Sequence, residues 1–515
     1  MKRIICLLLC TLLVLPTLFL FGCAKEEKVI RVCNCEDYID ESLFEEFEAK
    51  TGIRVEYSTY GTNENLYNEL VINPNSYDLV VPSEYMIQKL AAEGRINKLD
   101  LSKVEGYEQN VSQYIQRRLE NIKFTVQDGE HKGEQVALSD FMVGYMWGTM
   151  GWVYNTDVVS ESDVCNWENV FNNPALRKKT TIKDAVRDSY LVGLAMVYKD
   201  QLESATTNEQ ITEILNRVDQ RSIELVGQKL EQLKPFLYGF EVDSGKNDII
   251  LGNIDAYVAW SGDAAYAIDV AAGDAEDEDG TYVEDVKSLS YYIPDEGSNI
   301  WFDGFVMPSG SDNYDAVYEF LSFISSPESV YRNMDETGYT GIVSGGEFTM
   351  TVENEDGEEE QIQTTLFEQV VLEWFDESED LEDGQGISVD LSYFFGDDGD
   401  YTVVVSEESY GRLIAQYPTA EQVSRCAIMN YFENDTLVKI NEMWEGVKGE
   451  TFPTWALILI VVFVVLLAVF ILLYRNREKF RWFKLPQRKT TYAERKGLSV
   501  VKVEEIDLIK KHKKQ

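Results

Sequence analysis

Short apolar runs alternate with amphipathic stretches along the first hundred residues after the start of the chain. Residues 28–33 and 53–57 alternate apolar and polar side chains, which predicts two strands. Residues 79–81 are Leu-Val-Val without polar alternation, which predicts a parallel strand covered on both faces. Apolar residues at helical spacing predict helices between and after these strands, over 42–51, 65–71 and 86–93. This order predicts a βαβαβ unit with parallel strands.

The middle of the chain continues this alternation. Residues 255–260 and 300–307 are predicted strands, and residues 144–155 form a predicted extended crossover. A helix is predicted to begin at Lys183, which would place Asp184 and Asp188 on one face, four residues apart.

About 430 residues are too many for a single core, so we expect an α/β protein of two lobes. The first lobe is predicted at 28–150 and about 301–345, and the second at 151–300 and about 346–447.

The two ends of the chain predict attachment to a membrane. Residues 1–22 combine basic residues with an apolar run, which is typical of a secretory signal peptide. The following Cys23 completes a Leu-x-Gly-Cys motif that resembles the lipobox of bacterial lipoproteins, so Cys23 is the predicted lipidation site. Residues 455–474 carry no charge and are long enough to form a transmembrane helix. The tail at 475–515 has 14 Lys and Arg against 5 Asp and Glu, which predicts a cytoplasmic tail and extracytoplasmic lobes.

Charge and composition exclude several classes of function. The formal net charge is −44 although the tail is basic, and such an acidic exterior repels nucleic acid. The chain has two histidines, so His-based metal sites and catalytic triads are unsupported, and no cofactor is predicted. It contains neither a phosphate-binding Gly-x-x-x-x-Gly-Lys-Ser/Thr loop nor a Gly-x-Ser-x-Gly nucleophile elbow. We therefore expect a binding protein and not an enzyme.

Candidate binding residues follow the predicted strands. In open α/β sheets ligands lie beyond the carboxyl ends of the strands. Aromatic faces attract cations and carboxylates pair with them. An aromatic residue alone is more often part of a core, but here carboxylates recur beside the rings. The residues selected in this way are Glu36, Asp37, Tyr38, Ser83, Tyr85, Trp260, Trp301 and Asp303.

Several separated blocks resemble the spermidine/putrescine-binding proteins of bacterial ABC importers, over about residues 29–345. The blocks are Asn34-x-Glu36-Asp37-Tyr38, the stretch 52–60, Tyr77-Asp78-Leu79-Val80-Val81-Pro82-Ser83-x-Tyr85, Trp260-Ser261-Gly262 and Trp301-x-Asp303.

This resemblance implies a periplasmic-binding-protein fold whose two lobes close about a hinge on a linear polyamine. It implies ligand contacts at Asp37, Tyr38, Ser83, Tyr85, Asp188, Trp260, Trp301, Asp303 and Tyr339. Asp184 is a further candidate, because it lies beside Ala185, at a position that is acidic in some family members. The resemblance also implies ABC permease subunits and their ATPase as partners.

The chain departs from the family pattern at three places. Cys33 and Cys35 stand where the family has aromatic residues, Ala185 stands at a position that is acidic in some members, and residues 346–400 are longer and more acidic. A second hypothesis is a membrane-anchored ligand sensor or adaptor that uses the same lobes. An extracytoplasmic enzyme acting through Asp184 and Asp188 is a third, and it lacks a partner nucleophile.

Overall fold

The computed structural model describes residues 28–273, 288–353, 359–382 and 384–449, with residues 462, 463, 465, 466 and 469 beyond them. The described residues from 28 to 447 belong to one compact unit, to which the following description applies. The predicted signal peptide, Cys23 and the basic tail lie outside the described residues, as does most of the predicted span at 455–474. Within the part of the chain that is described, no helix is long and apolar enough to cross a membrane.

A three-stranded sheet contains the beginning of the described chain. Its order is β2 (Ile53–Tyr60), β1 (Lys28–Cys35) and β3 (Leu79–Val80), and β1 pairs in parallel with both neighbours. The helices α2 (Ser42–Thr51) and α3 (Asn63–Ile72) connect these strands, and α2 ends at Gly52 with a left-handed backbone (φ 72°). The predicted βαβαβ unit is therefore confirmed.

An eight-stranded sheet is built around β6 (Val143–Asn155), which is fully buried except at its end. The stretch predicted as an extended crossover is thus a strand of thirteen residues. The order is β17-β11-β6-β9-β7-β8, and β10 and β12 also pair with β6. The strands are β7 (Thr180–Lys183), β8 (Gly239–Glu241), β9 (Ala256–Trp260), β10 (Leu289–Tyr292), β11 (Ser298–Phe305), β12 (Thr340–Gly341) and β17 (Cys426–Ala427).

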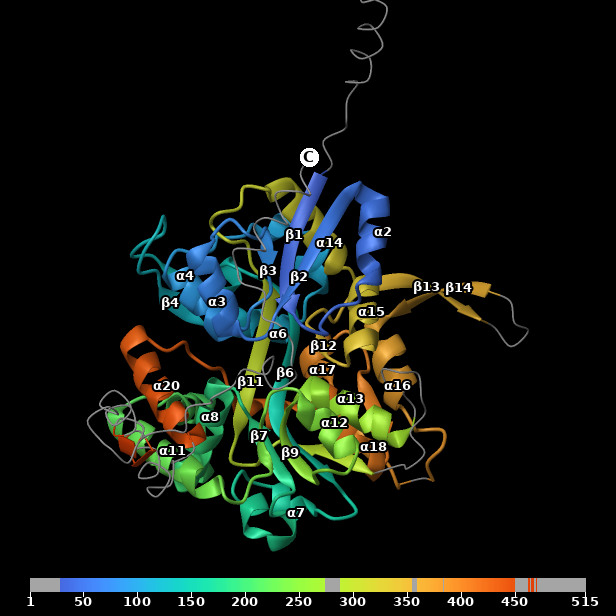
Figure 1. Ribbon diagram of the computed structural model, residues 1–515. Coiled ribbons are helices and arrows are strands. Elements are labelled where there is room, and N and C mark those ends of the chain that lie inside the picture. Colours follow the sequence, from blue (N-terminus) through green and yellow to red (C-terminus); the bar gives the residue numbers. More distant parts are fainter. Residues whose placement is uncertain are drawn as a thin grey trace, which may run out of the picture. The chain divides into compact units, whose positions relative to one another are not determined.

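The strand β11 connects the two sheets. It pairs antiparallel with β6 over residues 300–305, and Val306 just beyond it forms an isolated bridge with Val80 of β3. Ser83 and Asp303 form a second isolated bridge. In Figure 1, β6 and β11 accordingly run from the region of β1–β3 into the region of β7 and β9.

The remaining helices cover the sheets. The longer ones are α4 (Glu84–Ala92), α6 (Gln113–Asn121), α8 (Val186–Val197), α10 (Asn208–Leu215), α11 (Gln220–Leu233), α12 (Ser244–Ile250), α13 (Ser261–Ala272), α14 (Tyr314–Ile324), α15 (Pro327–Thr337), α18 (Glu407–Gln416) and α20 (Asn434–Lys448). Shorter helices are α5 (Tyr107–Asn110), α7 (Glu161–Val164), α9 (Lys199–Ser204), α16 (Glu373–Phe375), α17 (Ser392–Phe395) and α19 (Ala420–Ser424).

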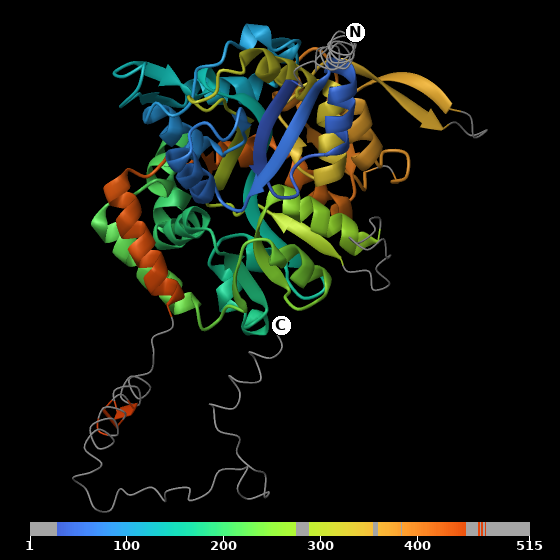
Figure 2. The same cartoon turned by 45° about the horizontal axis from the view of Figure 1, so that its top comes forward.

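The acidic region at 346–400 contains one antiparallel hairpin and the first strand of a second antiparallel pair. The hairpin pairs β13 (Glu347–Glu353) with β14 (Glu359–Thr365), and the second pair is β15 (Ile387–Asp390) with β16 (Thr402–Val405). Figures 1 and 2 both show the hairpin projecting from the elements around it. A third antiparallel pair, β4 (Lys123–Thr125) with β5 (Gln135–Ala137), lies earlier in the chain.

One predicted helix begins later than expected. Lys183 is the last residue of β7, and α8 starts only at Val186 with Ala185 at its N-cap. Asp184 therefore precedes the helix, and the prediction that Asp184 and Asp188 share a helical face is wrong. The backbone N–H of Asp184 donates instead to the carbonyl of Glu241 at 2.6 Å, which extends the pairing of β7 with β8.

Candidate ligand-binding site

The first part of the candidate site lies where β1 and β3 end beside β11. Tyr38 follows β1, Ser83 follows β3 at the N-cap of α4, and Asp303 lies within β11. The hydroxyl of Tyr38 donates to Oδ2 of Asp303 at 2.8 Å. Ser83 is held by Asn63, whose amide nitrogen donates to its hydroxyl at 3.0 Å and whose carbonyl oxygen accepts its backbone N–H at 3.1 Å.

Asp303 stands opposite an irregularity in the ladder. The register between β6 and β11 shifts between Phe302, which faces Trp147, and Gly304, which faces Gly144. Two residues of β6 therefore lie opposite Asp303, as in a β-bulge, a feature that often directs a side chain at a site. The Oδ1 atom of Asp303 is buried and has no hydrogen-bond partner among the described residues. This oxygen can still accept a hydrogen bond.

Aromatic rings pack beside this carboxylate. The ring of Tyr339 lies 4.9 Å from that of Tyr38 and 5.7 Å from that of Trp301, both measured between centroids and both edge to face. The ring of Tyr339 can approach this closely because residue 262 is glycine: a Cβ there would lie 2.2 Å from Cγ of Tyr339. Predicted residues that are distant in sequence thus form one aromatic group.

A buried ion pair borders the aromatic group at the ends of the parallel strands β7, β8 and β9. The hydroxyl of Tyr339 donates to Oδ1 of Asp263 at 3.0 Å, and Nζ of Lys183 lies 3.2 Å from Oδ2 of the same carboxylate. The same Nζ lies 3.7 Å from Glu241 and 4.2 Å from the centroid of the Trp260 ring. A lysine and two carboxylates therefore share this end of the site.

A second group of ionisable residues surrounds Tyr85. Its hydroxyl donates to Glu64 at 3.2 Å. The guanidinium of Arg187 in α8 donates to the side chain of Asn216 at 2.7 Å and lies 4.2 Å from the ring of Phe432, while its Nε and Nη1 have no hydrogen-bond partner in the described part of the chain. Glu84 is fully buried and accepts the backbone N–H of Phe302 at 3.2 Å.

Burial dominates the pKa values of the carboxylates in these groups. Burial raises the pKa of Asp303 to about 6, and the hydroxyls of Ser83 and Tyr38 oppose this rise. Burial likewise raises the pKa of Asp188 to about 6, opposed by Lys183, Arg187 and a hydrogen bond from Trp260. Burial raises the pKa of Glu84 to about 8. Strongly shifted carboxylates gathered in one region are typical of a functional site.

The structure places the predicted site residues in two sets. Tyr38, Ser83, Tyr85, Asp188, Trp260, Trp301, Asp303 and Tyr339 belong to the connected groups described above. Glu36 and Asp37 lie on the exposed turn after β1, where Asp37 has a positive φ of 50°. Glu36 is near enough to Asp243 to raise its pKa. Asp184 is half-buried in the loop before α8.

The two cysteines that replace aromatic residues differ in their surroundings. Cys33 is buried within β1, whereas Cys35 is half-buried at its end. Burial, Asp303, Asp243 and Asp263 together raise the pKa of Cys35 to about 12, so its thiol lies among the carboxylates of the site. Both thiols are free.

Sequence reasoning missed Asp263, Lys183, Glu241, Glu64 and Arg187. Each of Lys183, Glu241 and Asp263 lies at or just after the carboxyl end of a strand in the eight-stranded sheet. That position was the available signal, but Lys183 was predicted to begin a helix and Asp263 to lie in a turn, and no strand was predicted before Glu241. In the described residues, no cluster of three or more His, Cys, Asp or Glu side chains has the arrangement of a metal site.

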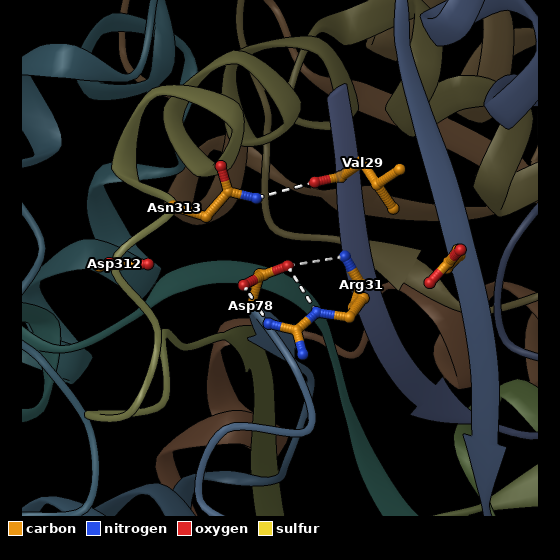
Figure 3. Close-up of a pocket in the computed structure, with 6 residues that line it drawn as sticks. Val29, Arg31, Asp78, Asp312 and Asn313 are labelled. Atoms are coloured by element: carbon orange, nitrogen blue, oxygen red, sulfur yellow. Dashed lines mark hydrogen bonds and ion pairs between the residues drawn. The ribbon is translucent and has the colours of Figure 1, made fainter. Parts of the chain in front are cut away.

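A cavity of about 470 Å³ lies elsewhere, toward the amino-terminal end of β1. It is lined by Val29, Arg31, Glu56, Asp78, Asp312 and Asn313. Figure 3 shows the guanidinium of Arg31 directed at Asp78, with Arg31 Nη2 at 2.9 Å from Oδ1 of Asp78. Its lining contains no aromatic ring and its arginine is already paired, so this hollow does not have the chemistry of the site above.

Carboxylates beside aromatic rings at the carboxyl ends of parallel strands have the chemistry to hold a small cationic solute. The chain belongs to the family of bacterial extracellular solute-binding proteins, whose model matches residues 42–345. This membership confirms the prediction that the chain is a binding protein and not an enzyme.

Curated relatives support the predicted resemblance. The spermidine/putrescine-binding periplasmic protein of Salmonella typhimurium is 25% identical over 317 residues, covering 61% of this chain and 78% of the relative. The putrescine-binding periplasmic protein PotF of Escherichia coli is 27% identical over 325 residues, with the same coverage.

A solved structure shows the same fold. The spermidine/putrescine ABC transporter substrate-binding protein PotD of Streptococcus pneumoniae superposes with a TM-score of 0.52 at 23% identity, covering 82% of this chain and 98% of that one. The predicted α/β periplasmic-binding-protein fold is therefore confirmed.

Proposed function

We propose that this protein captures a polyamine, spermidine or putrescine, outside the cytoplasm and presents it to an ABC importer. The names of its curated relatives support the ligand class and the transport role. On this proposal the permease subunits and their ATPase are its partners, and nucleic acid is not a ligand.

The observation that carries this proposal is the environment of Asp303. Its Oδ2 accepts the Tyr38 hydroxyl, its buried Oδ1 has no hydrogen-bond partner among the described residues, and the Tyr38, Trp301 and Tyr339 rings form one contact group. A ligand ammonium supplies what this oxygen lacks, and the adjoining rings suit an alkyl chain beside a cation. We propose Ser83, Tyr85, Asp188 and Trp260 as further ligand contacts, with Glu36, Asp37 and Asp184 at the periphery.

Isothermal titration calorimetry of the purified full-length chain tests this function. Putrescine, spermidine, spermine and agmatine are titrated separately, and neutral 1,4-butanediol serves as the control of similar chain length. Saturable binding of at least one amine, without binding of the diol, is the expected result. If none of the amines binds, the proposed ligand class is wrong.

We also propose a two-lobed organisation, with lobe 1 at 28–150 and about 301–345 and lobe 2 at 151–300 and about 346–447. The smaller of two buried apolar clusters supports a second lobe, because its buried members come only from residues 150–258 and 427–447, whereas buried residues from 249–293 and 348–426 pack with those of lobe 1 in the larger cluster. β6 and β11 then run between the lobes and provide the hinge. Limited proteolysis with and without a bound polyamine tests this, since closure of a hinge is expected to protect cleavage sites near it.

We further propose attachment to the membrane at both ends, through a lipid on Cys23 after cleavage of 1–22 and through a span at 455–474. Sequence alone supports this: the lipobox, the uncharged run and the basic tail at 475–515. External protease on intact cells is expected to remove the lobes and spare an epitope at the tail. Loss of that epitope without permeabilisation contradicts the topology.

A further inference from the structure

The ammonium of Lys183 has the surroundings expected for the ammonium of a bound amine. Its Nζ lies 2.6 Å from the carbonyl oxygen of Val242, 3.2 Å from Asp263 and 3.7 Å from Glu241. The centroid of the Trp260 ring is 4.2 Å away. Carboxylates together with an indole face are the chemistry by which the proposed site holds a cation.

The fold fixes Lys183 in this place. It is the last residue of β7, which pairs in parallel with β8 on one side and with β9 on the other. These strands end at Lys183, Glu241 and Trp260, so the three side chains reach the same edge of the sheet. The lysine side chain is only 1% exposed, and Asp263 and Glu241 raise its pKa against the effect of burial. It is therefore a permanent cation of the site.

The two carboxylates that contact the aromatic group differ in whether an oxygen atom remains without a hydrogen-bond partner. In Asp263, Lys183 occupies Oδ2 and the Tyr339 hydroxyl occupies Oδ1. In Asp303, Tyr38 occupies Oδ2 while Oδ1 is buried and has no hydrogen-bond partner in the described residues. An incoming ammonium thus finds a free oxygen at Asp303, whereas at Asp263 it meets another cation.

We propose that Lys183 is a specificity-determining residue that selects a diamine over a triamine. This inference rests on the proposed function and assigns the ligand class within it. The ammonium of Lys183 takes the carboxylate and indole position that a third ligand ammonium needs, and it repels that ammonium at the same time. The repulsion of the third ammonium offsets the binding energy that a longer amine gains from its additional contacts. The site therefore fits the putrescine class better than the spermidine class.

The ratio of the dissociation constants for spermidine and putrescine tests this proposal. Calorimetry on the full-length chain is expected to show a preference for putrescine of roughly tenfold or more. Lys183→Gln removes the charge but keeps an N–H donor toward Asp263, and it is expected to reduce this preference by roughly tenfold through tighter spermidine binding. Lys183→Arg keeps the charge and is expected to keep the preference.

Lys179→Gln is the matched control. Lys179 lies just before the other end of β7, where its ammonium donates to the carbonyl of Gly252 at 3.0 Å. Its replacement is expected to leave the ratio unchanged. If Lys183→Gln does not fold, the double variant Lys183→Met with Asp263→Asn removes both charges together. It removes the repulsion by Lys183 and leaves Glu241 in place, so a smaller reduction in the same direction is expected.

Two results overturn the proposal: a wild-type chain that binds spermidine as tightly as putrescine, and a preference that survives both Lys183→Gln and the double variant. A wild-type chain that binds neither amine is a different failure, because it overturns the proposed function itself.

Discussion

Replacing Asp303 by asparagine tests the central contact of the proposed site. The change keeps the shape of the side chain and removes the negative charge at Oδ1, the atom that has no partner among the described residues. Losing one partner of a desolvated charge pair weakens binding by about 2 to 5 kcal/mol. Asp303 is only half-buried, so the lower end applies. At about 1.4 kcal/mol per factor of ten, we expect putrescine to bind roughly thirtyfold more weakly.

The fold is expected to survive this change. Burial raises the pKa of Asp303 in the folded protein to about 6, above its ordinary value of 3.8, so at neutral pH the ionised form opposes folding. The amide removes that penalty, and the melting temperature of Asp303→Asn should not fall below that of the wild type.

Calorimetry with putrescine measures the loss, and Asp312→Asn provides the control. Asp312 is an exposed aspartate at the cavity beside Arg31, away from the aromatic group. It carries the same change in charge and is expected to bind putrescine as the wild type does. Equal affinities of Asp303→Asn and the wild type, or equal losses in both variants, would refute the assignment of Asp303.

Three further predictions concern the same site. Because the pKa of Asp303 is raised to about 6 and the ligand pairs with its ionised form, putrescine affinity measured by calorimetry should fall roughly tenfold from pH 7.5 to pH 5; an affinity independent of pH contradicts this pairing. Cys35→Trp should change the affinity for putrescine by more than about tenfold in either direction. Bound ligand should also slow alkylation of Cys35 relative to Cys165, which mass spectrometry can follow. If the variant binds as the wild type does and alkylation of Cys35 is the same with and without ligand, Cys35 is not in the site. Gly262→Ala places a Cβ against the Tyr339 ring, so the ring must shift; calorimetry should show putrescine binding weakened by about tenfold and the melting temperature should fall, and unchanged values of both contradict the close packing of this ring.

The periodicity of the sequence predicted the parallel strands and the helices of the three-stranded sheet because each of them is short and local. Gly52 and the apolar residues at 79–81 were sufficient signals for a helix end and for a buried strand. The start of α8 was not predictable in this way. Lys183 and Asp184 suit a helix terminus by composition, and only the pairing of β7 with β8 and β9 keeps them extended.

The candidate site was predictable as far as its members follow strand ends. Tyr38 was selected for that reason, whereas Trp301 and Asp303 were selected as a ring beside a carboxylate and lie inside β11; the structure brings all three together. Asp263 and Lys183 were missed because their importance lies in a contact between residues 80 positions apart, which no local pattern encodes.

The β-bulge opposite Asp303 means that the site depends on the number of residues in β6 as well as on their identity. Two residues, Tyr145 and Met146, fill the space between the positions paired with Gly304 and Phe302. Deleting one of them would give the two strands an unbroken ladder. It would also remove the local bend and the added twist that a bulge introduces, while the pairs on either side keep their partners. The loss of one residue would therefore change the direction of the Asp303 side chain relative to the aromatic rings while leaving each of these residues in the sequence.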